Sequence, residues 1–471
     1  MIETSTKNLS RLAAPAVLPP LDDSFRPLAL ANREFRRQVE QSGGGVPLVI
    51  GLERADGTRS RYETKVFAEN NPSADLNLPY IERIVKMLLW QKGGYKLIIG
   101  GPAQLGEQIA AIYSKSGARA FDWEFMGNTV YEKPFEVVVT GADQVPPANE
   151  ASIPLGKHLE GCRIGFDLGA SDRKVAAVID GESVFSEEVV WSPRDNTDPK
   201  YHFDEIMDGL KRAASHMPRV DAIGGSSAGV IVNNRPMVAS LFRGVPRDQF
   251  ETGVKNLFLN IKKAWGVPLE VTNDGDVTAL AGAMSLDDCC VLGVAMGSSE
   301  AVGYVNEDGN ITGWLNELAF APIDANPDAP ADEWSGDIGC GAQYLTQQAV
   351  FRLAAKLGIS LDGMDTLAAK LKFVQNMLQA GDENAKKIWE TIGVYAGYAT
   401  AHYADFYSIR HMLILGRVTS GDGGPIILAK AREVLDKEFP ELSAKIELHL
   451  PDEKTRRVGQ AVAAASLPMI K

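Results

Sequence analysis

Hydrophobic and polar positions in the first 150 residues follow both helical and strand patterns. Residues 29–45 and 78–94 carry apolar side chains at helical spacing, and both stretches run into glycines, which end helices readily. Residues 46–68 hold two strand-like runs on either side of Asp56–Gly57, a dipeptide typical of a hairpin turn. A strand followed by a helix is expected across residues 96–114. The pattern therefore predicts a mixed α/β region.

The pattern changes near Cys162, where strands dominate and then alternate with helices. Three consecutive strands are expected across residues 162–191, separated by turns that contain glycine. The elements expected after them are a helix (203–217), a strand (220–229), another helix, a short strand (269–274), a helix containing 277–284 and new strands (289–297 and 300–314). Two strand-rich starts, each followed by helices, predict two duplicated α/β lobes with a cleft between them.

Composition and charge narrow the classes of function. The 471 residues are 45% apolar and 23% charged, which is ordinary for a globular protein and excludes a largely disordered chain. The formal net charge of −13 would repel phosphate backbones and anionic lipids, so we expect neither nucleic acid nor a membrane as partner. No apolar run approaches the roughly 20 residues that span a bilayer. Four cysteines without CxxC spacing predict reduced thiols and a cytoplasmic location.

A glycine-rich turn at residues 101–106 has the glycine spacing of a Walker A loop but different chemistry. Glu107 and Gln108 stand where that motif needs a lysine and a hydroxyl residue to reach phosphate and magnesium. A glutamate would repel a phosphate, so we expect a plain turn between a strand and a helix.

A stronger candidate for a phosphate loop follows the strand that ends near Asp167. Gly169 allows a close approach of the backbone, and Ser171 and Lys174 can donate hydrogen bonds to phosphate oxygens. Asp167 at the end of the strand is suited to holding hydrated Mg²⁺. The same residues also fit an ordinary hairpin, and the phosphate loop gains weight from the motifs that follow it.

Further along the chain, several segments carry candidate chemistry. Asn273 and Asp274 lie between a strand and a helix, where they fit either a helix N-cap or a carboxylate base. Glu317 places an acid after a strand and near an aromatic residue. Two turns of small residues suit phosphates and a flat purine respectively, and they contain Gly297, Ser298 and Ser299, and Gly421, Gly423 and Gly424.

The order of these elements resembles the superfamily of actin, hexokinase and heat-shock chaperones (ASKHA), and within it the ROK family of sugar kinases and sugar-sensing repressors. The resemblance covers residues 162–471, where residues 223–229 and Asn273–Asp274 are similar to ROK segments near the sugar. It implies an α/β fold with two duplicated ribonuclease H-like lobes flanking a nucleotide cleft. The implied domains are an N-terminal α/β domain with linker (1–155), lobe I (160–275 with 452–471) and lobe II (276–451).

The resemblance also implies roles for individual residues. Asp274 would be the catalytic base, and Asp167 would hold Mg²⁺ through water. The acceptor would be bound by Asn273, Glu317, Ser227 and Gly229. The cofactors would be ATP and Mg²⁺, bound by Asp167, Gly169, Ser171, Lys174, Gly297, Ser298, Ser299, Gly421, Gly423 and Gly424. The implied partner is a small sugar or polyol, and a homodimer is compatible with the family.

The chain departs from the ROK pattern at several positions. Ala228 replaces a proline, and Phe320 replaces a histidine that follows the sugar-binding glutamate. The second phosphate loop lacks the glycine run of the ROK pattern and carries Ser299, Glu300 and Ala301. Only Cys340 remains of a cysteine cluster that often binds zinc in ROK proteins, and one thiolate cannot make a four-coordinate site. The six histidines show no compensating spacing, so we expect no structural zinc.

Three functions compete on this evidence. The resemblance favours ATP-dependent phosphoryl transfer to a hydroxyl of a sugar or polyol. A sugar-sensing repressor would need a basic DNA-binding head, whereas residues 1–150 carry 17 basic and 18 acidic residues and a net charge of −1. An ASKHA ATPase without a sugar substrate is kept as an alternative by the altered region around Phe320. We expect a kinase whose N-terminal region shapes the acceptor site or mediates oligomerisation.

Overall fold

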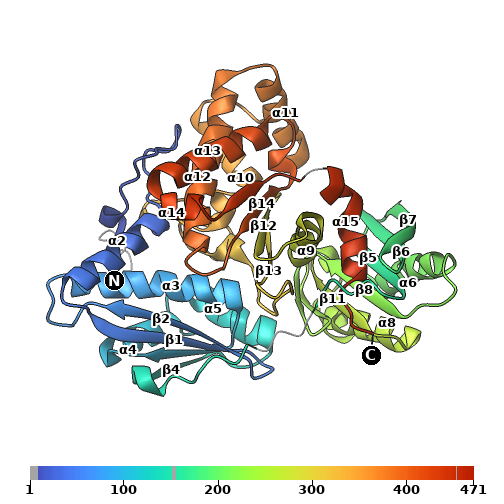
Figure 1. The fold of residues 1–471 in the computed structure, drawn as a ribbon, viewed down its shortest axis with the longest axis horizontal. Coiled ribbons are helices and arrows are strands. Elements are labelled where there is room, and N and C mark those ends of the chain that lie inside the picture. The colour runs from blue at the N-terminus through green and yellow to red at the C-terminus, as the bar shows by residue number, and fades with distance from the viewer. Residues whose placement is uncertain (1–8, 151–154, 452, 471) are drawn as a thin grey trace. The chain divides into compact units, whose positions relative to one another are not determined.

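The chain divides into two compact units in the computed structural model, which describes residues 9–150, 155–451 and 453–470 (Figure 1). Unit 1 comprises Met1–Ala151, Val294–Ala301 and Trp314–Leu450. Unit 2 comprises Ser152–Gly293, Val302–Gly313 and Pro451–Lys471. Residues 1–8 of the expected N-terminal domain and residues 151–154 of the expected linker lie outside the described residues. Residues 1–151 thus cluster with most of the segment predicted as lobe II.

A four-stranded sheet with the order β2–β1–β3–β4 forms the N-terminal part of unit 1 (Figure 1). Its strands are β1 (Val46–Glu53), β2 (Arg59–Val66), β3 (Lys96–Gly100) and β4 (Glu136–Thr140). The expected hairpin joins β1 to β2, and Gly57 adopts the left-handed φ of 84° that this turn requires. The expected helices are α2 (Leu28–Gln41) and α3 (Asn77–Lys92). Of the two glycines with Walker-like spacing, Gly101 lies in the turn from β3 into α4 (Ala103–Ile112), and Gly106 lies within α4.

The second part of unit 1 combines a sheet of order β13–β12–β14–β15 with helices. Its elements are β12 (Val291–Met296), β13 (Glu300–Val305), β14 (His411–Leu415), β15 (Glu447–His449), α10 (Gln347–Lys356), α11 (Leu367–Gln379), α12 (Glu383–Tyr403), α13 (Gly423–Glu438) and α14 (Pro440–Ser443). Strands β12 and β13 continue into unit 2. Helices α12 and α13 pack closely because Gly393 and Gly397 lie one turn apart on α12. A side chain at either position would press against the backbone of Ile427 or Ala431.

Unit 2 is built on a five-stranded sheet of order β11–β8–β5–β6–β7. Its elements are β5 (Cys162–Leu168), β6 (Asp172–Ile179), β7 (Glu182–Val190), β8 (Ala222–Ser227), β9 (Val230–Val232), β10 (Arg235–Val238), β11 (Leu269–Asn273), α6 (Pro199–Ala214), α7 (Arg247–Thr252), α8 (Leu257–Trp265), α9 (Asp274–Leu286) and α15 (Glu453–Ala465). Helix α15 lies against β5 and β8 because Gly165 and Gly224 leave room for it. A methyl group at either glycine would collide with the carbonyl oxygen of Ala461 or Ala464.

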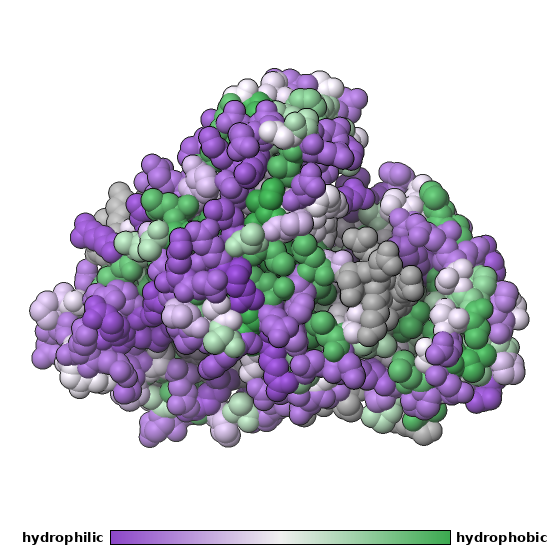
Figure 2. Space-filling view, turned by 45° about the horizontal axis from the view of Figure 1, so that its top comes forward, coloured by the Kyte–Doolittle hydropathy of each residue, from purple (hydrophilic) through white to green (hydrophobic). Residues whose placement is uncertain are grey.

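The three consecutive strands expected across residues 162–191 are β5, β6 and β7, which form antiparallel pairs. Mixed sheets covered by helices in both units confirm the predicted α/β class. Hydrophilic side chains cover most of the face drawn in Figure 2, in keeping with the charge of the chain. Within the described ranges, every helix is too short or too polar to cross a membrane.

Candidate functional site

The carboxyl ends of three parallel strands in unit 2 bring the predicted site residues of that unit together. In the register of the sheet, Asp167 of β5 pairs with Ser226 of β8, and Leu168 pairs with Ser227. Ser227 in turn pairs with Asn273 of β11. Because parallel strands end at the same edge of a sheet, residues 167, 227 and 273 share that edge, where α/β proteins commonly bind ligands.

Asp167 is a buried carboxylate held by one hydrogen bond. Its side chain is 5% exposed, and the Ser226 hydroxyl donates to Oδ1 at 2.7 Å. Burial raises the pKa of Asp167, while the bond from Ser226 opposes that rise. Ser226 was not singled out from the sequence, because only the pairing of β5 with β8 places it beside Asp167.

Asp274 begins helix α9 immediately after β11. Its neighbour Gly275 packs against the backbone of Val302, which fixes the start of the helix. Burial raises the pKa of Asp274 to about 6, and repulsion from Asp167 adds to this effect. Asp167 and Asp274 therefore form a pair of interacting carboxylates, both with raised pKa values. Their hard oxygen donors fit a hydrated Mg²⁺ ion, which takes few carboxylates and keeps several waters.

The predicted first phosphate loop is a tight turn between β5 and β6. The Gly169 amide donates to the carbonyl of Asp172 at 2.9 Å, and the Trp191 indole donates to the carbonyl of Gly169 at 2.9 Å. Ser171 donates to the Asp172 carboxylate. Lys174 lies 3.7 Å from the same carboxylate and keeps 41% of its side chain exposed. The lysine is therefore available to an anion.

The predicted acceptor residues of unit 2 differ in how much hydrogen-bonding capacity they have left. The Ser227 hydroxyl is buried and has no hydrogen-bond partner among the described residues. Asn273 uses its side chain within the protein, accepting from Gly275 at 2.7 Å and donating to the carbonyl of Gly229 at 2.8 Å. Gly229 has a φ of 109°, and a side chain there would collide with the backbone of Val238. Ser227 is thus the residue with an unused polar group.

The predicted second phosphate loop lies in unit 1 between β12 and β13. The Gly297 amide donates to the carbonyl of Ser299 at 3.0 Å, which closes a tight turn, and Ser298 and Ser299 are exposed. The backbone amide of Gln347, at the start of α10, donates a hydrogen bond to the Gly297 carbonyl at 2.9 Å. The two serine hydroxyls are therefore open to a ligand.

Glu300, which departs from the family's glycine run, is buried directly after this turn. Its side chain is 1% exposed, and Tyr403 donates to Oε1 at 3.1 Å. The other oxygen has no hydrogen-bond partner among the described residues. Burial raises the pKa of Glu300 to about 8, the Tyr403 bond lowers it, and repulsion from Glu317 raises it further. The two glutamates therefore interact, which sequence spacing did not indicate.

The loop that carries Glu317 is supported by the C-terminal end of α3. The Glu317 amide donates to the carbonyl of Trp90, and the Asn316 amide donates to the carbonyl of Gln91, both at 2.9 Å. Phe320, which the sequence resemblance places at a histidine position, stacks on Trp90 with ring centres 4.3 Å apart. Two further aromatic rings of the N-terminal region, Phe121 and Phe125, lie around it. The N-terminal region thus packs against the loop that carries Glu317.

A cavity of about 110 Å³ lies in unit 1 at the same end of α3. Its lining includes Gln91, whose buried Oε1 has no hydrogen-bond partner among the described residues, and Lys92. Burial lowers the pKa of Lys92 to about 7, and Glu150 opposes this shift. The Lys92 ammonium lies 2.9 Å from the centre of the Trp314 ring, close to the Glu317 loop.

The glycines predicted to accept a purine lie before and at the start of α13 in unit 1. Gly421 has a φ of 66° and is exposed. Gly423 and Gly424 are buried, the first against the Trp389 indole and the second against the carbonyl of Thr419. Of the three glycines, Gly421 is therefore the one whose surface is open.

The segment that contains Cys340 takes part in a buried charge network. Asp337 faces Arg83 at 3.2 Å, Lys86 at 3.3 Å and Arg119 at 2.6 Å. The Cys340 thiol is buried beside Asp337. All three cations come from the N-terminal region. Sequence reasoning missed this network because Asp337 lies more than 200 residues along the chain from each of the three cations.

Comparison with known proteins identifies the fold. No protein-family model and no curated protein matches the chain. Among solved structures, a ROK hexokinase from Thermus thermophilus matches with a TM-score of 0.50 and 18% identity, over 64% of this chain and 97% of its own. This chain has the ROK fold. A ROK family transcriptional regulator, a homologue of the E. coli MLC protein, also matches with a TM-score of 0.50 and 18% identity, over 66% of this chain and 78% of its own. The ROK fold predicted from the motifs is thereby confirmed.

Proposed function

We propose that the protein transfers the γ-phosphoryl group of ATP to a hydroxyl group of a sugar or polyol. The observation that carries the proposal is the carboxylate pair of unit 2. Asp274, at the start of α9, interacts with the buried Asp167, and its pKa is raised to about 6. A general base works best when its pKa lies near the working pH. The ROK fold and the ROK hexokinase among the similar structures support a sugar kinase.

In the proposed mechanism, each site residue has one role. Asp274 accepts the proton of the acceptor hydroxyl as the hydroxyl oxygen attacks the γ-phosphorus, and the bond from that phosphorus to the β–γ bridging oxygen breaks to release ADP. Asp167 would hold hydrated Mg²⁺, and the ion would supply positive charge to neutralise charge that develops on the phosphates. Ser171, Lys174 and the exposed serines at 298 and 299 donate hydrogen bonds to phosphate oxygens, and Gly421 lies against the purine.

The acceptor is proposed to contact Glu317 and the unpartnered hydroxyl of Ser227. The N-terminal region would shape this acceptor site, because Trp90 supports the Glu317 backbone and stacks on Phe320. An aromatic ring in place of a histidine exchanges a polar contact for an apolar surface, which suits the C–H face of a sugar or polyol ring. We therefore expect an acceptor preference that differs from that of a histidine-containing ROK kinase.

The test is phosphorylation of a panel of sugars and polyols by the full chain and by Asp274→Asn. Removing a general base should lower kcat by about 10² to 10⁴-fold, while the amide preserves the helix start and the thermal midpoint. For the wild type, kcat/KM should rise with pH through about 6, because Asp274 must be deprotonated to act.

The matched control is Asp248→Asn, which changes an exposed aspartate in the first turn of α7 in the same unit. This control should retain full activity. Wild-type turnover by Asp274→Asn would refute the assignment of the base. ATP hydrolysis that no sugar or polyol in the panel stimulates would favour the alternative of an ASKHA ATPase.

A further inference from the structure

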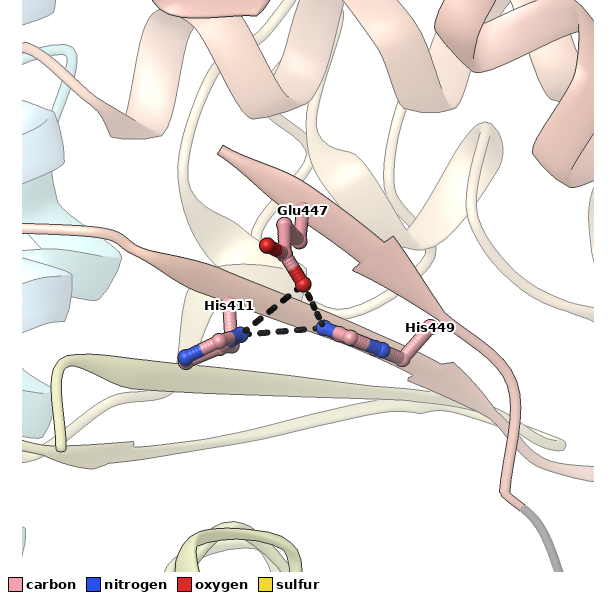
Figure 3. A group of neighbouring side chains, drawn as sticks. All are labelled: His411, Glu447 and His449. Atoms are coloured by element: carbon pink, nitrogen blue, oxygen red, sulfur yellow. Dashed lines mark hydrogen bonds and ion pairs between the residues drawn. The ribbon is translucent and has the colours of Figure 1, made fainter. Parts of the chain in front are cut away.

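Two histidines and a glutamate converge on the sheet of unit 1, at the parallel pairing of β14 with β15. His411 pairs in register with Glu447, and Leu413 pairs with His449. Glu447 and His449 are two residues apart on one strand, so both side chains lie on the same face of the sheet. Figure 3 shows the two imidazole rings and the carboxylate pointing toward one another.

The donor atoms are spaced as the ligands of one metal ion would be. His411 Nδ1 lies 3.0 Å from His449 Nε2, and Glu447 Oε2 lies 3.9 Å from the first nitrogen and 3.6 Å from the second. The circle through these three atoms has a radius of about 2.1 Å, which matches the bond lengths of about 2.0–2.2 Å from zinc to histidine and carboxylate ligands. An ion at its centre would reach all three ligands without movement of the backbone.

We propose that His411, Glu447 and His449 form a binding site for a divalent ion of the zinc type. Two imidazoles and one carboxylate suit a borderline metal, whereas Mg²⁺ and Ca²⁺ prefer oxygen ligands alone. The histidine side chains are 12% and 23% exposed and that of Glu447 is 71% exposed, so water can complete the coordination. This proposal replaces the expectation of a protein without zinc. Sequence spacing could not indicate the site, because 38 residues separate the two histidines.

The position of the cluster indicates a structural role for the ion. Strand β15 is an edge strand of its sheet and pairs with β14 over three residues only. The chain leaves unit 1 at Leu450, one residue after His449. A metal that joins His411 to both ends of β15 would hold this short strand in place.

The test is titration of the chelator-treated full chain with Zn²⁺ by calorimetry, and with Co²⁺ by visible absorption. We expect one ion per chain, a rise in the thermal midpoint with Zn²⁺, and visible bands typical of nitrogen- and oxygen-bound Co²⁺. His411→Gln and His449→Gln should each weaken Zn²⁺ binding at least tenfold and abolish the thermal response. In a chelating buffer their midpoints should stay near that of the wild type, which separates loss of the metal from loss of the fold.

The matched control is His216→Gln, because His216 is an exposed histidine that stacks on Phe185 in unit 2. This variant should bind Zn²⁺ like the wild type. If the wild type binds no zinc at micromolar concentrations, or if the variants at 411 and 449 bind it equally well, the proposal is wrong. The outcome is independent of kinase activity, since it is read from metal binding alone.

Discussion

Replacing Asp337 by asparagine should destabilise unit 1 strongly, because Asp337 balances a buried group of charges. The group has three cations and three carboxylates, and each residue is less than 10% exposed. Its members are Glu82, Arg83, Lys86, Arg119, Asp122 and Asp337. Arg83 and Lys86 lower the pKa of Asp337 although burial acts in the opposite direction. The carboxylate is therefore ionised in the folded protein.

The size of the stability loss follows from the interactions that the asparagine amide at position 337 cannot make. Asparagine keeps the shape of the side chain, but its NH₂ group would point a donor at cations that need acceptors, and three buried cations would face two carboxylates. Removing one partner of a buried ion pair typically costs about 3–5 kcal/mol. At a urea dependence of roughly 3 kcal/mol per molar, this loss lowers the midpoint of unfolding by about 1–1.7 M urea.

The assay is urea unfolding followed by tryptophan fluorescence, since the Trp90 indole donates to Asp122 within the same group. The control is Glu34→Gln, which removes a partly exposed pair with Arg37 and should leave the urea midpoint almost unchanged because solvent screens exposed pairs. The double variant Arg83→Gln with Asp337→Asn should lose less than the sum of the two single variants, because it restores the charge balance. A loss for Asp337→Asn as small as that of the control would refute the reasoning.

Two further predictions concern stability. Glu300→Gln should stabilise the protein more as pH rises from 5 to 9. Burial raises the pKa of Glu300 to about 8, above its value in the unfolded chain, so the wild type loses stability through this range. Thermal midpoints of both proteins at several pH values measure the effect, and a difference that stays constant with pH would contradict the prediction. Gly224→Ala should lower the free energy of unfolding by about 1–3 kcal/mol, because the added methyl group would collide with the Ala464 carbonyl. Urea unfolding measures the loss, with Gly313→Ala as the control because nothing lies within 4 Å of a methyl group there. Equal midpoints for the two variants would contradict the packing argument.

Local patterns predicted the elements of the fold better than the contacts between them. The hairpin at Asp56–Gly57, helix α3 and the run β5–β6–β7 depend on neighbours in sequence, so spacing and turn chemistry were sufficient. The motif order also predicted the ROK fold. The interaction of Asp167 with Asp274 could be anticipated because strand ends of one sheet meet at one edge. The pairing of Arg83 with Asp337 and the His411–His449 cluster had no local signal, since long-range contacts are decided by packing.

The two departures from the ROK pattern near residues 320 and 340 have one physical explanation. Both fall in a segment that packs against α3 of the N-terminal region, where Phe320 stacks on Trp90 and Asp337 faces Arg83 and Lys86. A histidine would place a polar ring among aromatic side chains, and thiolates that bind zinc would add negative charge to a group that is already balanced. Aromatic stacking and ion pairs thus hold this segment against α3. The N-terminal region and the altered motif therefore depend on each other, and we expect changes in one to require changes in the other.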